Sequence, residues 1–269
     1  MLPEPILRCD HLVKFYDTDA GRVQAVRGVD IELEAGAVAA VVGPSGSGKS
    51  SLLRMLAGVD RPTAGSVLID GVDLWRLGER ARAATRAQLL THVYQRPSDN
   101  LFSHLTAEMQ LDRVRATASH EIVGEWLDRL GLAHRARSVP EQMSGGERQR
   151  LAFARAAVAG HRLVIADEPT SQLDSGSAAA VMDAVDTLSS HGVTVLVATH
   201  DRRVLERVDE VIALRDGAVA TVTSGGEQLS VIDRSGRLQL PPELQERFAG
   251  RRVRLRWDAD SPIVELEEP

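Results

Sequence analysis

The feature that most constrains the fold of this sequence is a glycine-rich segment that follows a short apolar run. Residues 38–42 read Val-Ala-Ala-Val-Val, and residues 43–50 read Gly-Pro-Ser-Gly-Ser-Gly-Lys-Ser. The second stretch has the spacing Gly-x-x-x-x-Gly-Lys-Ser/Thr, which is the pattern of a phosphate-binding loop. The apolar run predicts a buried strand, and residues 49–56 predict a helix that stops near Gly58. A loop between a strand and a helix argues against a chance glycine-rich turn.

Each residue type in this loop has a chemical task. The glycines let the backbone curl, so that successive N–H groups point inward at phosphate oxygens. The following helix presents its free N–H groups and about half a positive charge to the same anion. We expect Lys49 to contact the β- and γ-phosphates and Ser50 to offer its hydroxyl to Mg²⁺. The predicted nucleotide-binding residues of the loop are Gly43, Pro44, Ser45, Gly46, Ser47, Gly48, Lys49, Ser50 and Ser51.

A second apolar run, residues 163–166, ends in two acids and a proline: Asp167, Glu168 and Pro169. Carboxylates at the carboxyl end of a buried strand lie where α/β folds bind ligands. Asp167 is the natural second anchor for Mg²⁺, and Glu168 is the natural base, or water-positioning group, for attack on a γ-phosphate. Taken alone, the pair would be read as a solvated strand end, but the phosphate-binding loop favours the catalytic interpretation.

The rest of the chain predicts strands that alternate with helices. Further strands are expected at residues 6–13, 26–33, 67–69, 90–95, 193–198 and 208–214, and helices at 145–159 and 178–188. This order predicts an α/β fold with a largely parallel sheet. Aromatic residues make up only 3% of the chain. Small aliphatic residues must therefore build the core, as suits a sheet that is buried on both faces.

A third motif narrows the P-loop proteins to one family. Residues 140–150 read Pro-Glu-Gln-Met-Ser-Gly-Gly-Glu-Arg-Gln-Arg. They resemble the signature motif of ABC ATPases, usually Leu-Ser-Gly-Gly-Gln, and the order of motifs matches that family over residues 5–222. Met143 replaces the usual leucine, and Gln172 stands where alanine is common. Glu147 replaces the usual glutamine, as in the branch that resembles lipoprotein-release and macrolide-efflux ATPases. None of these changes removes a group that the chemistry needs, so we expect a P-loop ATPase with a competent site.

The resemblance implies roles for residues outside the two motifs above. Tyr16 resembles the aromatic that stacks on adenine, although Phe15 is a neighbouring competitor. Gln95 resembles the glutamine that touches Mg²⁺ or the attacking water and faces the transmembrane partner. His200 resembles the switch histidine that contacts the γ-phosphate. The expected catalytic residues are thus Glu168, His200, Gln95 and Lys49, the metal ligands Ser50, Gln95 and Asp167, and the remaining nucleotide contacts Tyr16, Ser144, Gly145, Gly146, Glu147 and Asp174.

The signature also predicts a dimer. Ser144, Gly145 and Gly146 at the start of a helix make a second anion site. In the family, two domains pair head to tail, and the signature of each closes on the ATP of the other, which makes an isologous homodimer. Residues 171–174 resemble the loop through which the two domains sense each other.

Composition bears on partners and compartment. The net charge of −6 argues against general nucleic-acid binding. No apolar run reaches the roughly 18 residues that a membrane helix needs, so a separate integral-membrane permease would have to supply the crossing. The single cysteine, Cys9, and the lack of signal-peptide features predict a cytoplasmic protein. The resemblance to ABC ATPases implies that it is peripheral on the inner face of the membrane. The resemblance thus implies the ATP-hydrolysing subunit of an ABC transporter, with ATP and Mg²⁺ as cofactors and export favoured.

We expect an ATPase domain over residues 1–223, with a helical subdomain at about 96–145, and a small β-rich domain over 224–269. Residues 232–257 resemble the swapped hairpin of AbrB-like regulators. This tail is a homodimerising clamp, a plain accessory domain, or a segment that binds nucleic acid or a regulator through its arginines. Binding to nucleic acid ranks lowest, because the acids that follow these arginines would oppose a phosphate backbone. The acids are Asp258, Asp260, Glu265, Glu267 and Glu268.

Two other functions belong to different classes. One is a soluble ABC ATPase that acts on ribosomes or DNA, but such proteins usually carry two ATPase halves or a long coiled coil. This chain has one phosphate-binding loop, one signature and no sustained heptads. The other is a nucleotide-sensing regulator that works through its tail, and the intact Lys49, Asp167, Glu168 and His200 argue against it.

Overall fold

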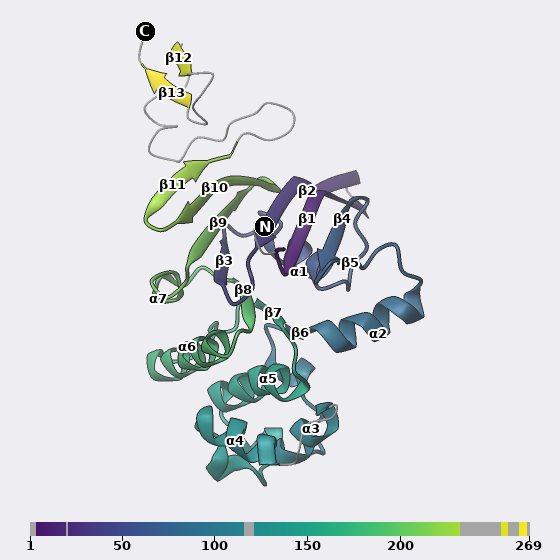
Figure 1. The fold of residues 1–269 in the computed structure, drawn as a ribbon, viewed down its shortest axis with the longest axis vertical. Helices are drawn as coiled ribbons and strands as arrows, with labels where there is room; N and C mark the ends of the chain where they lie inside the picture. Colours follow the sequence, from purple (N-terminus) through teal and green to yellow (C-terminus); the bar gives the residue numbers. More distant parts are fainter. Residues whose placement is uncertain (1–3, 20, 116–120, 232–253, 258–263, 268–269) are drawn as a thin grey trace.

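The computed structural model describes residues 4–19, 21–115, 121–231, 254–257 and 264–267. Its main element is a seven-stranded sheet in the order β11-β10-β9-β3-β8-β7-β6 (Figure 1). The strands from β6 to β9 are parallel, and β10 and β11 are antiparallel additions at one edge. The bounds of these strands are β3 Val38–Val42, β6 Leu90–Val93, β7 Leu163–Asp167, β8 Thr194–Ala198, β9 Glu210–Arg215, β10 Ala218–Ser224 and β11 Glu227–Ser230.

A second, antiparallel sheet lies beside the first, in the order β2-β1-β4-β5. Helix α1 shares a hydrophobic core with strands of both sheets. The four strands are β1 Leu7–Thr18, β2 Gly21–Leu33, β4 Ala64–Ile69 and β5 Val72–Asp73, and α1 spans Lys49–Leu56.

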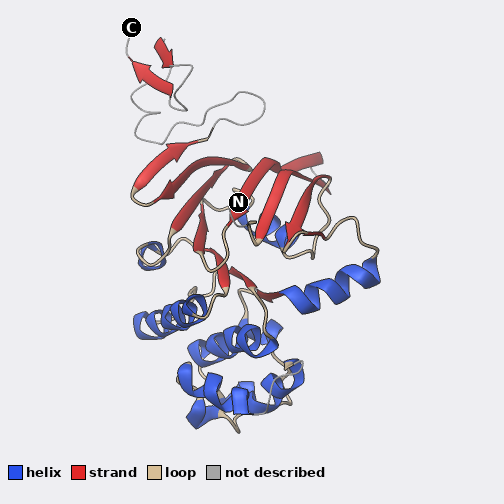
Figure 2. Cartoon of the chain, in the orientation of Figure 1, coloured by secondary structure: helices blue, strands red, loops and turns tan. Residues whose placement is uncertain are grey.

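Helices α5 and α6 cover the opposite face of the seven-stranded sheet, and α3, α4 and α5 form the end of the molecule farthest from the second sheet (Figures 1 and 2). Three short 3₁₀ turns, η1 to η3, connect them. Helix α2 lies on the other side, where its Leu89 packs against the core around α1. The bounds are α2 Glu79–Leu89, η1 Pro97–Asn100, α3 Ala107–Val114, α4 Glu121–Arg129, η2 Ala133–Arg135, η3 Pro140–Gln142, α5 Gly145–Ala159, α6 Ser175–Ser190 and α7 Arg202–Leu205.

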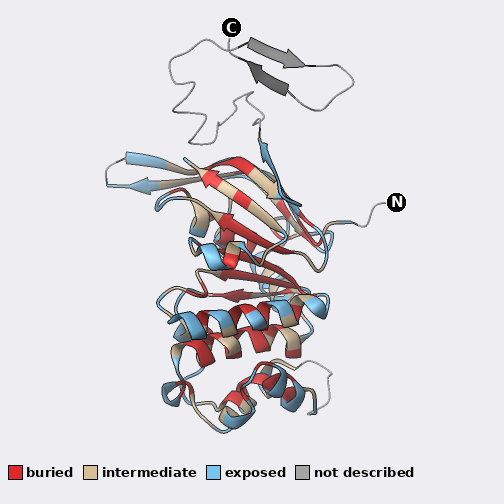
Figure 3. Cartoon of the chain, turned by 90° about the vertical axis from the view of Figure 1, so that its left-hand side faces the viewer, coloured by how far each residue is buried: buried red, intermediate tan, exposed pale blue. Residues whose placement is uncertain are grey.

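The central strands are buried on both faces, which confirms the expectation from their composition. Along β7, Leu163 and Ile165 belong to the core around α1, whereas Val164 and Ala166 belong to the core beneath α5 and α6. This alternation follows from the period of two in a strand. Figure 3 shows buried residues filling the strands in the middle of the molecule.

The bounds predicted for β3, α1 and α5 agree with the structure. The strand predicted at 90–95 ends earlier, at Val93. The reason is that the Asn100 amide takes the backbone groups that would continue it: Nδ2 donates to His92 O at 2.7 Å, and Oδ1 accepts from Tyr94 N–H at 2.9 Å. The helix predicted at 178–188 is longer, because Asp174 caps it by accepting from Ser177 N–H at 2.9 Å.

The boundary expected at residue 224 falls inside the seven-stranded sheet. Gly225 and Gly226 have φ angles of 58° and 85° and form the turn between β10 and β11, so the sheet continues to Ser230. The glycines at the expected boundary therefore belong to a hairpin turn, which favours glycines with positive φ. Whether a separate domain follows stays a prediction.

In the tail, β12 (Arg254–Trp257) pairs antiparallel with β13 (Val264–Glu267). This two-stranded pairing does not test the AbrB-like resemblance, which stays a prediction. The remaining expected elements of that resemblance, residues 232–253, lie outside the described residues. None of the helices in the described ranges combines the length and apolarity that a membrane crossing needs.

The side chain of Phe153 on α5 is fully buried in the core beneath the sheet. Phe153→Ala should lower the free energy of unfolding by about 3–5 kcal/mol, because it removes buried apolar surface and leaves a cavity. Chemical denaturation would measure the change. Phe102→Ala is the matched control, since that ring is 44% exposed. Equal losses for both variants would contradict the assignment of Phe153 to the core.

Candidate functional site

The glycine-rich loop runs from the end of β3 to the start of α1, wedged between backbone segments of β2 and β9. A Cβ at Gly43 would lie 2.2 Å from Leu214 O, and one at Gly48 would lie 2.3 Å from Ala25 O. Both glycines also have positive φ angles, 149° and 97°. Only glycine satisfies this close approach and this backbone conformation.

Lys49, the first residue of α1, closes this loop with its side chain. Its Nζ donates to Gly43 O at 2.7 Å and to Pro44 O at 3.1 Å. The ammonium is therefore held at the loop, together with the N-terminal N–H groups of α1. This arrangement offers positive charge and backbone donors to one anion, as the sequence predicts.

Ser50 and Asp167 are brought together from α1 and the end of β7. The Ser50 hydroxyl is within hydrogen-bonding reach of the Asp167 carboxyl. Burial raises the pKa of Asp167, and the adjacent Glu168 raises it further, while Ser50 and Lys49 oppose the shift. A hydroxyl and a carboxylate oxygen are ligands that Mg²⁺ prefers.

The described residues contain no group of three His, Cys, Asp or Glu side chains that could hold a metal alone. A cation at Ser50 and Asp167 would therefore take its other ligands from phosphate oxygens and water. That is the usual coordination of Mg²⁺ at nucleotide sites, so the residues present fit this ion.

Glu168 and His200 meet at the carboxyl ends of β7 and β8. Glu168 Oε1 lies 3.2 Å from His200 Nδ1. Glu168 has a φ of 45°, a conformation that is uncommon outside glycine. Ser171 stabilises it, since its N–H and Oγ–H donate to Glu168 O at 3.1 and 2.8 Å. A cavity of about 350 Å³ beside this pair is lined by Glu168, Thr170, Ser171, Gln172, Leu173, Thr199, His200, Asp201, Arg202 and Arg203.

The structure separates the two aromatic candidates on β1. Tyr16 is within hydrogen-bonding reach of Ser51 in the first turn of α1, so it lies on the side of the phosphate-binding loop. Phe15 instead packs under Arg22, whose Cζ is 4.3 Å from the ring centroid. Tyr16 is therefore the better candidate for contact with a bound base. Gln95 lies exposed beyond the end of β6, and its role toward Mg²⁺ stays a prediction.

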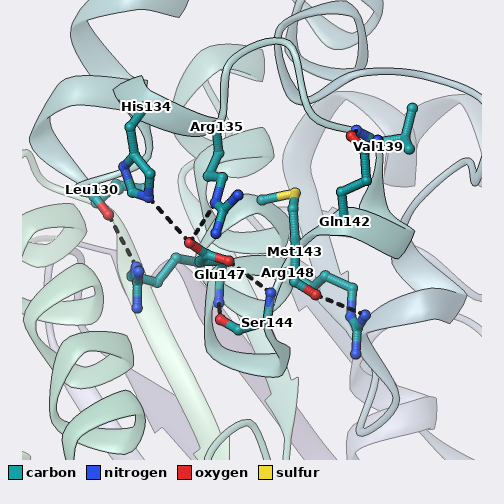
Figure 4. Close-up of polar contacts among 10 residues, drawn as sticks. Leu130, His134, Arg135, Val139, Gln142, Met143, Ser144, Glu147 and Arg148 are labelled. Carbon is teal, nitrogen blue, oxygen red and sulfur yellow. Dashed lines mark hydrogen bonds and ion pairs between the residues drawn. The ribbon is translucent and has the colours of Figure 1, made fainter.

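The signature begins α5 with a reciprocal cap (Figure 4). Ser144 Oγ accepts from Glu147 N–H at 3.2 Å, and Glu147 Oε2 accepts from Ser144 N–H at 2.7 Å. The two glycines pack on the segment after β7, because a Cβ would lie 3.1 Å from Leu173 at Gly145 and 2.9 Å from Ser177 at Gly146. The signature thus contacts the loop that contains Asp174.

The Glu147 carboxylate is held by groups of its own chain, and its contact with a nucleotide stays a prediction. Its Oε1 accepts from Arg135 Nε at 2.8 Å and lies 3.2 Å from His134 Nε2, so its partners belong to its own chain (Figure 4). Burial alone would raise the pKa of this carboxyl, but the bonds from Arg135 and Ser144 outweigh it and lower the pKa to about 2. The Ser-x-x-Glu spacing of a capping box was readable in the sequence. Arg135 was not identifiable from it.

A larger cavity of about 550 Å³ lies beside the loop that follows Gln95. It contains half-buried guanidinium groups: burial lowers the pKa of Arg86 and of Arg155. Each donates to a backbone carbonyl, Arg86 to Ala57 and Arg155 to Asn100. The lining residues are Arg86, Ala87, Leu90, Thr91, His92, Tyr94, Asp99, Asn100, Leu101, Phe102, Arg113, Val114, Arg155, Ala159 and His161.

The sequence and fold are similar to those of known proteins. The family model described as "ABC transporter" matches residues 26–171. The chain is 38% identical to the lipoprotein-releasing system ATP-binding protein LolD 2 of Caulobacter vibrioides, over 80% of this chain and 97% of that protein. It is 40% identical to the pyoverdine export ATP-binding/permease protein PvdT of Pseudomonas syringae pv. tomato, over 77% of this chain but only 32% of that protein.

Among solved structures, the fold is similar to that of one chain of the ATP-binding cassette MJ0796, in the dimeric structure of its post-hydrolysis state bound to ADP and Pi. The TM-score is 0.72 at 31% identity, covering 81% of this chain and 98% of that chain.

The capping role of Glu147 predicts a pH-dependent stability. Glu147→Gln keeps the shape of the cap but loses the charge opposite Arg135, so the free energy of unfolding at pH 7 should fall by roughly 1–3 kcal/mol. Because the folded-state pKa is lowered, the contribution of Glu147 is present above its ordinary pKa of 4.5 and is lost as the pH falls toward about 2.

Denaturant unfolding of both proteins between pH 7 and pH 3 would measure this difference, which should shrink below pH 4.5. Glu141→Gln is the matched control, because Glu141 is exposed in the same segment. A difference that stays constant over this range would refute the ionic role of Glu147.

Proposed function

Because this chain belongs to the ABC transporter ATP-binding proteins and hydrolyses ATP, we propose that its hydrolytic site is built from Lys49, Ser50, Asp167, Glu168 and His200. The observation that carries this assignment is their convergence. Ser50 lies within hydrogen-bonding reach of Asp167 at the end of β7, and Glu168 of the same strand end meets His200 beyond β8. The cofactor contacts of the loop residues and of Tyr16 belong to the same proposal.

Within this site, each side chain takes one part of the reaction. The loop N–H groups and Lys49 bind the β- and γ-phosphates, and Ser50 and Asp167 would hold Mg²⁺, which neutralises charge on those phosphates when bound. Glu168 accepts a proton from water as the water oxygen bonds to the γ-phosphorus. The bond from that phosphorus to the β–γ bridging oxygen breaks, leaving ADP and inorganic phosphate. His200, beside Glu168, orients this carboxylate and contacts the γ-phosphate.

The proposal includes a head-to-tail homodimer. Ser144 is exposed at the start of α5, and the helix start offers N–H donors to an anion from outside the chain. The solved cassette to which this chain is similar is a dimer. We assign Ser144, Gly145, Gly146 and Asp174 to the interface, where they would face the nucleotide of the second subunit.

The proposed membrane partner is a separate permease. The 550 Å³ cavity beside Gln95, with the exposed ring of Phe102 at its rim, would receive this partner. Relatives named for lipoprotein release and pyoverdine export support an export-like system. In this proposal the protein works on the cytoplasmic side, peripheral to the inner face of the membrane. For residues 232–257, the AbrB-like resemblance supports a homodimerising clamp or an accessory domain.

Lys49→Ala should weaken binding of Mg-ATP by at least about tenfold, because the phosphates lose a charge-assisted hydrogen bond. Isothermal titration of the full chain would measure the dissociation constant. Arg80→Ala is the control, since it removes an exposed cation from α2. Unchanged affinity in the Lys49 variant would remove this lysine from the site.

Glu168→Gln should bind Mg-ATP but hydrolyse it at least about a hundredfold more slowly, because the amide cannot accept the proton from water. Light scattering after size exclusion should then show a dimer that forms with Mg-ATP and persists. Glu125→Gln, at an exposed position on α4, is the matched control. Hydrolysis of ATP by Glu168→Gln at the wild-type rate would contradict the assignment of Glu168 as the base.

A further inference from the structure

Asp60, in the segment that follows α1, is bonded to two side chains of β1. Its Oδ2 accepts from the Tyr16 hydroxyl at 2.6 Å, and its Oδ1 accepts from Lys14 Nζ at 2.7 Å. Lys14 also donates to Arg61 O at 2.7 Å. The Lys14 and Asp60 side chains are only 12% and 19% exposed, so solvent screens this pair weakly. The carboxylate therefore satisfies two donors from one strand.

The backbone ties the same two segments together. Thr63 N–H donates to Val13 O at 2.8 Å, and Phe15 N–H donates to Thr63 Oγ1 at 3.1 Å. On its other side, Asp60 N–H donates to Arg54 O in the last turn of α1 at 3.1 Å. Asp60 thus connects the helix that carries the phosphate-binding loop with the strand that carries Tyr16.

The Tyr16 ring is fixed in place by these contacts. Lys14 Nζ lies 4.9 Å from the ring centroid, so one face of the ring carries a cation. The hydroxyl is anchored by Asp60, and the ring is half-buried, which leaves part of it open to a stacked base. A ring whose position is fixed before binding loses less conformational entropy when a base stacks on it.

We propose that Asp60 is a positioning residue for nucleotide binding, which acts by holding the Tyr16 ring at a fixed place relative to the phosphate-binding loop. It sets the affinity for the adenosine part of the nucleotide and leaves the phosphate contacts unchanged. This inference rests on the proposed stacking of Tyr16 on adenine.

The protonation states suit this role. Burial alone would raise the pKa of Asp60, but the bonds from Lys14 and Tyr16 outweigh it and lower the pKa. Burial, and then the bond to Asp60, raise the pKa of Tyr16. Near neutral pH the carboxylate is ionised and accepts, and the phenol keeps its proton and donates.

Two variants remove the anchor in different ways. Tyr16→Phe keeps the ring but loses the hydroxyl. Asp60→Asn puts one acceptor and one amide donor where two donors converge, so a bond to Lys14 or Tyr16 is lost. Asp10→Asn is the matched control, because Asp10 lies on β1 and bonds to Arg8 at the surface. Thermal unfolding would verify that each variant is folded.

Titration of the full chain with two probes tests the inference. Mg-ADP contains the base and is not hydrolysed by an ATPase, whereas inorganic pyrophosphate with Mg²⁺ contains only the phosphates. Asp60→Asn and Tyr16→Phe should each weaken Mg-ADP about six- to tenfold, within the range that base–aromatic stacking supplies. Pyrophosphate affinity should not change. The double variant should be no weaker than the worse single variant, because both act through one bond.

Equal weakening of both probes by Asp60→Asn, or additive losses in the double variant, would overturn the positioning role in favour of a general structural one. Tyr16→Ala separates the two levels of the proposal. Unchanged Mg-ADP affinity in that variant would show that Tyr16 does not stack on the base. If Tyr16→Ala weakens Mg-ADP binding but Tyr16→Phe and Asp60→Asn do not, the role of Asp60 alone would be overturned.

Discussion

The close fit of the phosphate-binding loop between the two sheets is the constraint on which the site depends. Backbone carbonyls of Ala25 and Leu214 occupy the space that side chains at residues 48 and 43 would need. The loop is consequently in close contact with backbone on both sides. Helix α1 shares its core with strands of both sheets. A rigid loop presents its N–H groups in one arrangement, so little reorganisation accompanies binding of an anion.

Four carboxylates that the structure describes fall into two kinds according to their neighbours. Asp60 and Glu147 are saturated by donors of their own chain, and their pKa values are lowered. Asp167 has a raised pKa, chiefly because of burial, and Glu168 lies in an open cavity beside His200. The first pair joins the elements that carry proposed binding residues, while the second pair is the one that we propose acts on Mg²⁺ and water. Residue type alone does not distinguish these uses, since all four are acids.

Local patterns in the sequence were sufficient for the central elements. The apolar run at 38–42, the glycine spacing after it and the capped start at Ser144 each lie within a few residues, so β3, α1 and α5 could be predicted with their bounds. The contacts of Asp60 with Tyr16 and of Glu147 with Arg135 span 44 and 12 positions, and no local pattern indicates them. The sequence at Gly225 and Gly226 was also ambiguous, because glycine pairs occur both in hairpin turns and at domain boundaries.

The chain has two lysines, Lys14 and Lys49, and both belong to the proposed nucleotide site, whereas all the other Lys or Arg side chains are arginines. One supports the tyrosine ring and the other closes the phosphate-binding loop. Acetylation and other acylations of side-chain amines act on lysine and remove its charge. Because the other basic side chains are guanidinium groups or imidazoles, acylation of side-chain amines could remove positive charge from this chain only at the proposed nucleotide site.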